Sequence, residues 1–222
     1  MGTHFITGTG TDIGKTWLTC ALLRHWQAAG LRPAGYKPVL SGFDEQQAAT
    51  SDAGQILQAL GREITPAALD EIAPWRFAAP LSPDLAAARE GRRVDFEDLV
   101  ALTRRITSTE FLPTLIEGVG GVMVPLDERH TVRDWIAASQ LPCVLVAGSY
   151  LGSLSHTLTA LEALQKAGAG VTAIVVNESP GSSVALVDTL ASLRCHAGGV
   201  PLVAITRTAP QTGIAELAAC LG

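Results

Sequence analysis

Positive charge is scarce in this sequence. The chain of 222 residues has 16 Lys and Arg residues against 21 Asp and Glu residues, a formal net charge of -5. A protein that binds nucleic acid or a membrane surface over a broad area normally carries a basic patch. The acidic balance therefore argues against both functions, although a single site for an anionic ligand remains compatible with it.

Long apolar runs and paired cysteines are also missing. The most apolar run, Leu141–Ala147, is far shorter than the roughly 20 residues that cross a bilayer. The four cysteines are scattered, with no C-x-x-C pair and no spacing typical of metal ligation. The first residues show neither the basic head nor the long apolar stretch of a signal peptide. We therefore expect a cytoplasmic protein.

The order of apolar segments predicts the fold class. A hydrophobic fraction of 47% is sufficient for a folded core. Short apolar runs alternate with helical patterns, and continuous apolar strands are typical of a parallel sheet covered on both faces. We expect an α/β fold, a doubly wound, mainly parallel sheet with helices on both faces. The expected strands are His4–Gly8, Arg32–Leu40, Leu112–Glu117, Pro142–Gly148, Val171–Asn177 and Pro201–Thr206, and the expected helices are Lys15–Ala29, Ser51–Leu60, Phe96–Ile106, Ser155–Lys166, Ser182–Leu193 and Thr212–Leu221.

The region 43–93 differs from the rest of the chain. Prolines at positions 66, 74, 80 and 83 interrupt it, and it lacks an apolar period long enough to form a core of its own. We interpret it as an irregular insertion within a single domain that spans residues 1–222.

The strongest motif is Gly8–Thr16, with the sequence Gly-Thr-Gly-Thr-Asp-Ile-Gly-Lys-Thr, between the first expected strand and the first expected helix. This is the context that a phosphate-binding loop requires. Glycines let backbone N–H groups turn toward a phosphate, and the helix N-terminus adds partial positive charge. Lys15 would reach the β and γ phosphates, and the Thr16 hydroxyl would bind Mg²⁺. Gly8 lies one residue earlier than in the standard G-x-x-x-x-G-K-[ST] pattern, so an ordinary glycine-rich turn is the alternative.

Charged residues near two strand ends fit the same chemistry. Lys37 lies near the end of the second expected strand and Glu117 ends the third, where an open α/β sheet faces its ligand crevice. A triphosphate with a reacting anion needs more compensation than one lysine supplies. An acid in the position of Glu117 holds Mg²⁺ in enzymes with this loop, and Asp52 is a second candidate. From position alone, the alternatives are that Lys37 is a solvated lysine, that Glu117 caps a turn, and that Asp52 is an acid at a helix N-terminus.

Together these residues resemble the dethiobiotin synthetase family. Each motif is weak by itself, but their order and spacing are specific, and the early glycine is the form that this family uses. The resemblance rests on Thr7–Thr16, Gly35–Val39, Ser41–Gly42, Ser51–Ala53, Glu117–Gly121, Val124–Leu126, Asp134–Trp135, Leu151–Gly152 with His156, and Val176–Asn177.

The resemblance implies an ATP- and Mg²⁺-dependent ligase of biotin biosynthesis. CO₂ adds to one amine of 7,8-diaminononanoate and gives a carbamate. ATP phosphorylates the carbamate to a carbamic-phosphoric anhydride, and the second amine closes the ring to dethiobiotin with release of ADP and phosphate. The family is a homodimer whose substrate tail reaches the subunit interface.

The resemblance also implies residue roles. Lys15 and Lys37 are catalytic: Lys15 contacts the phosphates and Lys37 bridges the carbamate and the γ-phosphate. The Mg²⁺ ligands would be Thr16, Asp52 and Glu117. ATP would be bound by Gly10, Thr11, Asp12, Ile13, Gly14, Lys15, Thr16, Glu117 and Asn177, of which Asn177 reads the adenine edge. The substrate would be bound by Thr11, Asp12, Lys37, Ser41, Gly152 and Ser153, the last two near the subunit interface.

Three features depart from the family pattern, and all concern the substrate tail. Ser155 precedes His156 where the family usually has Asn, and Asp84 stands where the family often has His. The expected helix Ser182–Leu193 contains no tyrosine, which some relatives use near the substrate carboxylate.

Other functional classes fit the sequence less well. A cobyrinate-type amidating ligase needs an added glutaminase portion, for which 222 residues leave no room. A nucleotide switch for partition or septum placement carries an extra lysine at the position of Gly10, and its membrane-bound members end in a basic amphipathic helix, whereas Thr212–Leu221 has no Lys or Arg. A serine hydrolase is disfavoured because Ser149 and Ser153 do not lie in a G-x-S-x-G motif.

Overall fold

The computed structural model describes residues 2–108 and 110–222. Its centre is a six-stranded sheet in the order β2-β5-β1-β6-β7-β8, and every neighbouring pair in it is parallel. β2 and β5 lie on one side of β1, and β6, β7 and β8 lie on the other, so the expected doubly wound α/β fold is confirmed. The strands are β1 (Thr3–Gly8), β2 (Ala34–Tyr36), β5 (Thr114–Glu117), β6 (Cys143–Gly148), β7 (Val171–Asn177) and β8 (Leu202–Ile205).

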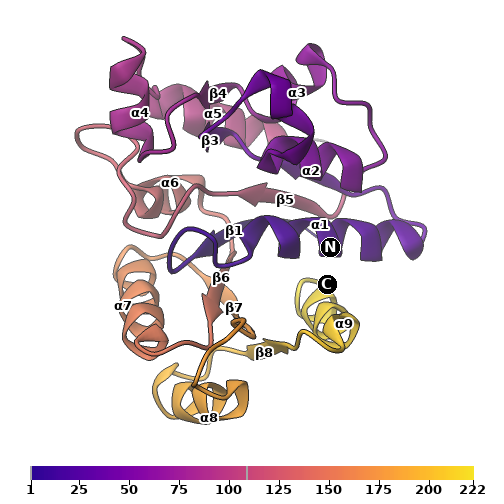
Figure 1. Ribbon diagram of the computed structural model, residues 1–222, viewed down its shortest axis with the longest axis vertical. Helices are drawn as coiled ribbons and strands as arrows, with labels where there is room; N and C mark the ends of the chain where they lie inside the picture. The colour runs from indigo at the N-terminus through magenta and orange to yellow at the C-terminus, as the bar shows by residue number, and fades with distance from the viewer. Residues whose placement is uncertain (1, 109) are drawn as a thin grey trace.

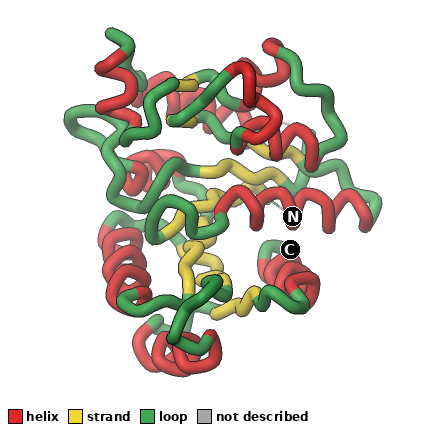
Figure 2. Tube along the Cα trace, viewed as in Figure 1, coloured by secondary structure: helices red, strands yellow, loops and turns green. Residues whose placement is uncertain are grey.

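Helices surround the sheet, which lies in the interior (Figures 1 and 2). One group is α1 (Lys15–Ala28), α2 (Asp52–Ala59) and α9 (Pro210–Cys220), in which α1 contacts both others. The second group is α5 (Phe96–Thr107), α6 (Val132–Ser139), α7 (Ser153–Lys166) and α8 (Leu186–His196), which contact one another in chain order. Figure 1 shows α7 and α9 on opposite sides of the sheet. Coverage from both sides explains why the central strand β6 is buried along its whole length.

The expected strand Arg32–Leu40 is divided into two, and this part of the prediction is wrong. β2 joins the main sheet, whereas β3 (Val39–Ser41) pairs in parallel with β4 (Trp75–Phe77) in a separate small sheet. The break falls at Lys37-Pro38, because proline has no N–H to continue the ladder of the main sheet. The break leaves Lys37 directly beyond the end of β2.

The region 43–93 is more regular than its prolines indicate. Besides α2 and β4 it contains a 3₁₀ helix, η1 (Glu45–Thr50), and two short helices, α3 (Pro66–Ile72) and α4 (Pro83–Arg89). Both α3 and α4 begin at a proline, which is favoured at the first helical position because the missing N–H has no partner there. Two of the four prolines therefore start helices instead of breaking them.

Helix α6 is a further element that the sequence did not reveal. It carries Trp135, which is fully buried and meets Phe5 of β1 edge-to-face, with ring centroids 4.6 Å apart. The Trp135 indole N–H donates a hydrogen bond to the Thr103 hydroxyl of α5 at 2.9 Å. This helix therefore links α5 to β1 in the middle of the sheet. Within the described residues, no helix combines the length and apolarity needed to span a bilayer.

The first turn of α6 depends on Asp134. Its carboxylate accepts hydrogen bonds from the Thr131 backbone N–H at 2.8 Å and the Thr131 hydroxyl at 2.7 Å, and it pairs with Arg133. Partial burial disfavours the ionised form, but the hydrogen bonds from Arg133 and Thr131 outweigh it and lower the pKa of Asp134. A carboxylate with a lowered folded-state pKa stabilises the protein above its unfolded pKa and loses this effect as the pH falls.

We therefore expect Asp134→Asn to lower the free energy of unfolding at neutral pH by about 1 kcal/mol, the usual value of a lost helix cap. The difference from the unsubstituted protein should shrink as the pH falls below the ordinary aspartate pKa of about 3.9, because the folded carboxylate protonates only below that value. Urea denaturation at a series of pH values measures it. Asp188→Asn, in the first turn of α8, is the control and should have a smaller effect. A loss for Asp134→Asn that is independent of pH would contradict this account.

Candidate active site

The loop between β1 and α1 is anchored to the end of β7. Gly14 caps α1 with a φ of 93°, a left-handed conformation that favours glycine. A Cβ atom added to Gly14 would lie 2.5 Å from the Asn177 side-chain nitrogen. That nitrogen donates a hydrogen bond to the Ile13 carbonyl at 2.8 Å. The absence of a side chain at Gly14 thus lets the loop close against β7.

Lys15 lies folded over its own loop. Its Nζ donates to the Gly10 carbonyl at 2.7 Å, and the side chain is largely buried. Burial and the nearby positive charge of Lys37 lower the pKa of Lys15 to about 8. Two lysines this close at a helix N-terminus favour the binding of an anion, which would relieve their repulsion.

Lys37 and Glu117 meet because their strands are neighbours. The register pairs Tyr36 of β2 with Ile116 of β5, so the next residue of each strand reaches the same edge of the sheet. Lys37 Nζ lies 2.7 Å from Glu117 Oε1 and 2.8 Å from Asp52 Oδ2, and it donates to the Gly118 carbonyl at 2.9 Å. Lys37 and Glu117 are almost completely buried. The structure thus brings together three of the residues predicted for the site.

The opposite charges of this cluster stabilise one another's ionised forms. Burial by itself lowers the pKa of Lys37, but the charges and hydrogen bonds of Glu117 and Asp52 outweigh it and raise the pKa above its ordinary value. Burial likewise raises the pKa of Asp52, but the charge and the hydrogen bond of Lys37 outweigh it and lower that pKa. Lys37 and Asp52 are therefore both ionised at neutral pH.

The residues around Lys37 fit a magnesium ion. The Thr16 hydroxyl donates to Glu117 Oε1 at 2.7 Å, so one hydroxyl and two carboxylates surround the position that the Lys37 ammonium occupies. Mg²⁺ prefers oxygen donors and often binds through one or two carboxylates with water and phosphate completing its shell. Among residues 2–108 and 110–222, no group of three or more His, Cys, Asp or Glu residues could hold a metal.

Thr19 is a contact that the sequence did not reveal. Its hydroxyl donates to Glu117 Oε2 at 2.8 Å, so the two oxygens of Glu117 are bound by two threonines of α1. The spacing of three residues between Thr16 and Thr19 places both on one face of the helix. That spacing is the signal that could have identified Thr19.

A cavity of about 560 Å³ opens between this cluster and the small sheet. The Ser41 hydroxyl is buried and has no hydrogen-bond partner within the described part of the chain. The predicted residues that line the cavity are Thr11, Asp12, Gly14, Lys15, Thr16, Lys37, Ser41 and Asp52. The remaining lining, which is mostly apolar, comes from Trp17, Leu40, Pro80, Leu81, Ser82, Pro83, Val119, Gly120 and Val124.

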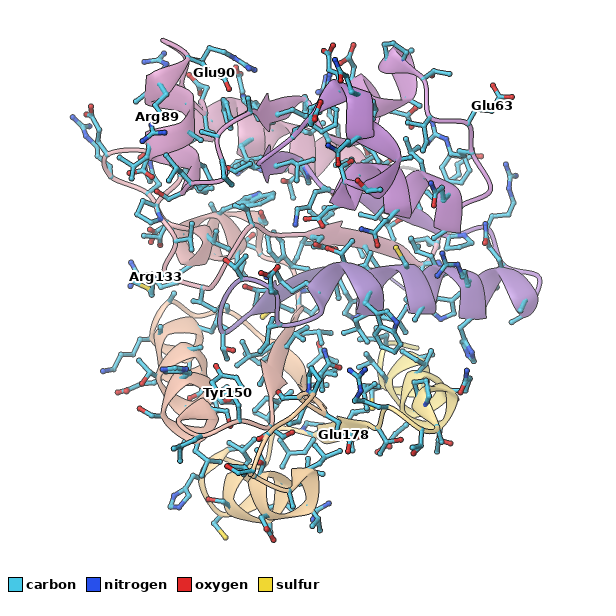
Figure 3. All side chains as sticks on the ribbon, in the orientation of Figure 1. Glu63, Arg89, Glu90, Arg133, Tyr150 and Glu178 are labelled. Atoms are coloured by element: carbon cyan, nitrogen blue, oxygen red, sulfur yellow. The ribbon has the colours of Figure 1, made fainter. Side chains whose placement is uncertain are left out.

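A second cavity of about 490 Å³ lies on the other side of the loop. The Asn177 side-chain oxygen is buried and without a hydrogen-bond partner among the described residues. Glu178, labelled in Figure 3, follows β7 at this cavity. The predicted residues in its lining are Asp12, Ile13, Gly14 and Asn177.

Four predicted site residues line neither cavity: Gly10, Glu117, Gly152 and Ser153. Gly10 and Glu117 nevertheless contact Lys15 and Lys37, whereas Gly152 and Ser153 lie away from this cluster. They lie at the start of α7, where Gly152 is the N-cap. Nearby, the Tyr150 hydroxyl lies 2.9 Å from His156 Nδ1 (Tyr150 is labelled in Figure 3). Of the positions that depart from the family pattern, Asp84 lies in the first turn of α4 and Ser155 in the first turn of α7.

The parallel sheet, the loop between β1 and α1, and the acid at the end of β5 define a P-loop nucleoside-triphosphate-binding protein. A family model described as "AAA domain" matches residues 2–213. Hydrogenase maturation factor HypB from Archaeoglobus fulgidus aligns with a TM-score of 0.60 at 11% identity, covering 100% of this chain and 88% of that chain. The cell division ATPase MinD from Pyrococcus furiosus aligns with a TM-score of 0.54 at 15% identity, covering 97% and 88%. At such identities these structures show the fold alone.

Sequence comparison identifies the particular family. The ATP-dependent dethiobiotin synthetase of Acidiphilium cryptum is 48% identical over 202 residues, covering 90% of this chain and 91% of that protein. That of Phenylobacterium zucineum is 44% identical over 223 residues, covering 100% and 94%. The chain belongs to the ATP-dependent dethiobiotin synthetase family. The resemblance seen in the sequence is confirmed, and the alternatives of an amidating ligase and a nucleotide switch are not favoured.

The buried charge cluster gives a prediction for the ligand-free protein. Lys37→Met leaves Glu117 and Asp52 facing each other without a cation, and removing one partner of a buried pair costs roughly 3–5 kcal/mol. We expect a loss of free energy of unfolding near the lower end of this range, because the Asp52 side chain is 33% exposed and can reach water. Urea denaturation in a chelator measures it.

The matched control is Lys166→Met, which removes the exposed pair of Lys166 with Glu162 on α7. Exposed pairs of this kind are worth less than about 1 kcal/mol. Equal, small losses in the two variants would show that Glu117 and Asp52 tolerate the loss of their cation, which would contradict this prediction.

Proposed function

We propose that this chain is the ATP- and Mg²⁺-dependent ligase that converts 7,8-diaminononanoate and CO₂ into dethiobiotin, with release of ADP and phosphate, in biotin biosynthesis. One observation carries the proposal: Lys15 and Lys37 lie together with Asp52 and Glu117 beside the P-loop. The printed names of relatives at 44–48% identity support the same activity.

The two lysines can neutralise the negative charges that this reaction brings together. A carbamate oxygen and the γ-phosphate are both anionic, so the protein has to hold them in line and neutralise them. We assign Lys15 to the phosphates and Lys37 to the bridge between carbamate and γ-phosphate. The buried carboxylates keep Lys37 charged and oriented toward the first cavity. Both lysines are therefore proposed as catalytic residues.

Mg²⁺ would be held by Thr16, Asp52 and Glu117, whose oxygens fit a hard cation. When bound, the ion would neutralise charge that develops on the phosphate oxygens. In this assignment Thr19 is a positioning residue, since its hydroxyl fixes the second oxygen of Glu117.

The two cavities suggest where ATP and the diamine bind. The backbone of Gly10, Thr11, Asp12, Ile13 and Gly14, at the start of α1, would bind the phosphates together with Lys15, Thr16 and Glu117, and the free oxygen of Asn177 would accept a hydrogen bond from the adenine amino group. Thr11, Asp12, Lys37 and Ser41 would bind the carbamate and the diamine in the first cavity, whose apolar lining suits an alkyl chain.

The remaining assignments concern assembly and location. Gly152 and Ser153 line neither cavity of one copy, so their contact with a substrate tail would require a second copy. We therefore propose a homodimer, which is supported by Leu151, an apolar side chain 86% exposed beside Gly152. The first cavity is lined by β3 of the small sheet and by the segments that follow β1, β2 and β5 of the main sheet, which supports one domain over residues 1–222. The need for ATP favours the cytoplasm, and no nucleic acid or membrane partner is proposed.

The proposal predicts that ADP release requires every substrate. We expect turnover to fall to background when the diamine, bicarbonate or Mg²⁺ is omitted, because the anhydride cannot form without a carbamate and a neutralised triphosphate. A coupled assay for ADP, with mass spectrometry of dethiobiotin, measures it. A nonanoate with a single amine is the control: it can form a carbamate but cannot close a ring. ATP turnover that ignores the diamine would refute the proposed function.

A further inference from the structure

Trp17 is an aromatic residue beside the candidate active site, and the proposed function assigns it no role. It lies in the first turn of α1, directly after Thr16, and is 46% exposed. It lines both cavities, so it lies at the boundary between the first cavity and the second. A tryptophan has a large apolar surface, and leaving half of it in water forgoes stabilisation that burial would provide.

The second cavity has the chemistry of a site for a flat ring. Much of its wall is apolar, since Ile13, Pro180, Ile205 and Pro210 line it together with Trp17. The Asn177 side-chain oxygen is buried there without a partner, because the nitrogen of the same amide is already bound to Ile13. An apolar slot with one free acceptor fits a heterocyclic ring that carries an amino group.

Chain geometry places Trp17 on the path between phosphates and base. The loop and the N-terminus of α1 are the phosphate site of the proposed function, and Trp17 is two residues beyond Lys15. A nucleotide bound with its phosphates at this loop and its base at Asn177 would extend into the cavity that Trp17 lines. Indole rings stack favourably on nucleic acid bases of any kind.

We propose that Trp17 is a specificity-determining residue, which packs against the nucleoside part of the triphosphate and makes binding depend on the presence of a base. The inference rests on the proposed function only in taking the ligand to be a nucleoside triphosphate. It concerns binding and not the chemical step.

The test compares ATP with inorganic tripolyphosphate, which has the phosphates but no nucleoside. Calorimetric titration with Mg²⁺ and without the diamine should show Trp17→Val binding ATP about tenfold more weakly, the scale of one base–aromatic stack. Its affinity for tripolyphosphate should change less than about twofold. Trp17→Phe, which keeps an aromatic ring, should recover most of the loss. In turnover the KM for ATP should rise while kcat at saturating ATP stays within about twofold.

Fluorescence gives an independent readout. ATP should change the tryptophan emission of the unsubstituted protein and tripolyphosphate should change it less, because only ATP reaches the indole. The change should be lost in Trp17→Phe, since Trp26 and Trp135 are buried in the core and Trp75 lies in β4, outside the lining of the second cavity. Phe111→Val, which removes an exposed aromatic side chain outside both cavities, is the matched control and should leave the ATP affinity unchanged.

The outcomes separate this inference from the proposed function. Equal loss of ATP and tripolyphosphate binding in Trp17→Val, or no loss of either, overturns the role of Trp17. If ADP release ignores the diamine while ATP binding still depends on Trp17, the proposed reaction fails and the base contact stands.

Discussion

The buried contact of Lys37 with Glu117 and Asp52 is the interaction on which the site depends. It joins the end of β2 to the end of β5 and to the start of α2, and through Thr16 and Thr19 it reaches the helix that follows the P-loop. Removing charges from water is expensive, and such a pair is weak support for stability compared with apolar packing. Its value here is positional, because it fixes a lysine and two carboxylates at the edge where an anion would bind.

Much of this arrangement follows from the sequence. Apolar segments of strand length alternating with helices predict a parallel sheet, and the carboxyl ends of such strands meet at one edge. Lys37 and Glu117 were predicted together for that reason, and the Gly-Lys-Thr motif located the loop beside them. The register of β2 with β5 then makes their contact unavoidable.

Other parts could not be read from the sequence. The apolar run through Val39 hides the break after Lys37, since a strand leaving one sheet for another keeps its apolar pattern. Pro66 and Pro83 look like interruptions although each begins a helix. The spacing of Thr16 and Thr19 puts both on one face of α1, but only the fold shows that this face meets Glu117 and that Trp17 lines two cavities.

We propose that Lys37 serves the reacting anion besides holding its carboxylates. The most direct measurement is the single-turnover rate of ADP formation by Lys37→Ala, with saturating ATP, Mg²⁺, bicarbonate and diamine, in protein shown by circular dichroism to be folded. The account predicts a rate about 10²–10³ lower than that of the unsubstituted protein, the effect of losing one positioned charge. A rate close to that of the unsubstituted protein would contradict it and remove Lys37 from the chemical step.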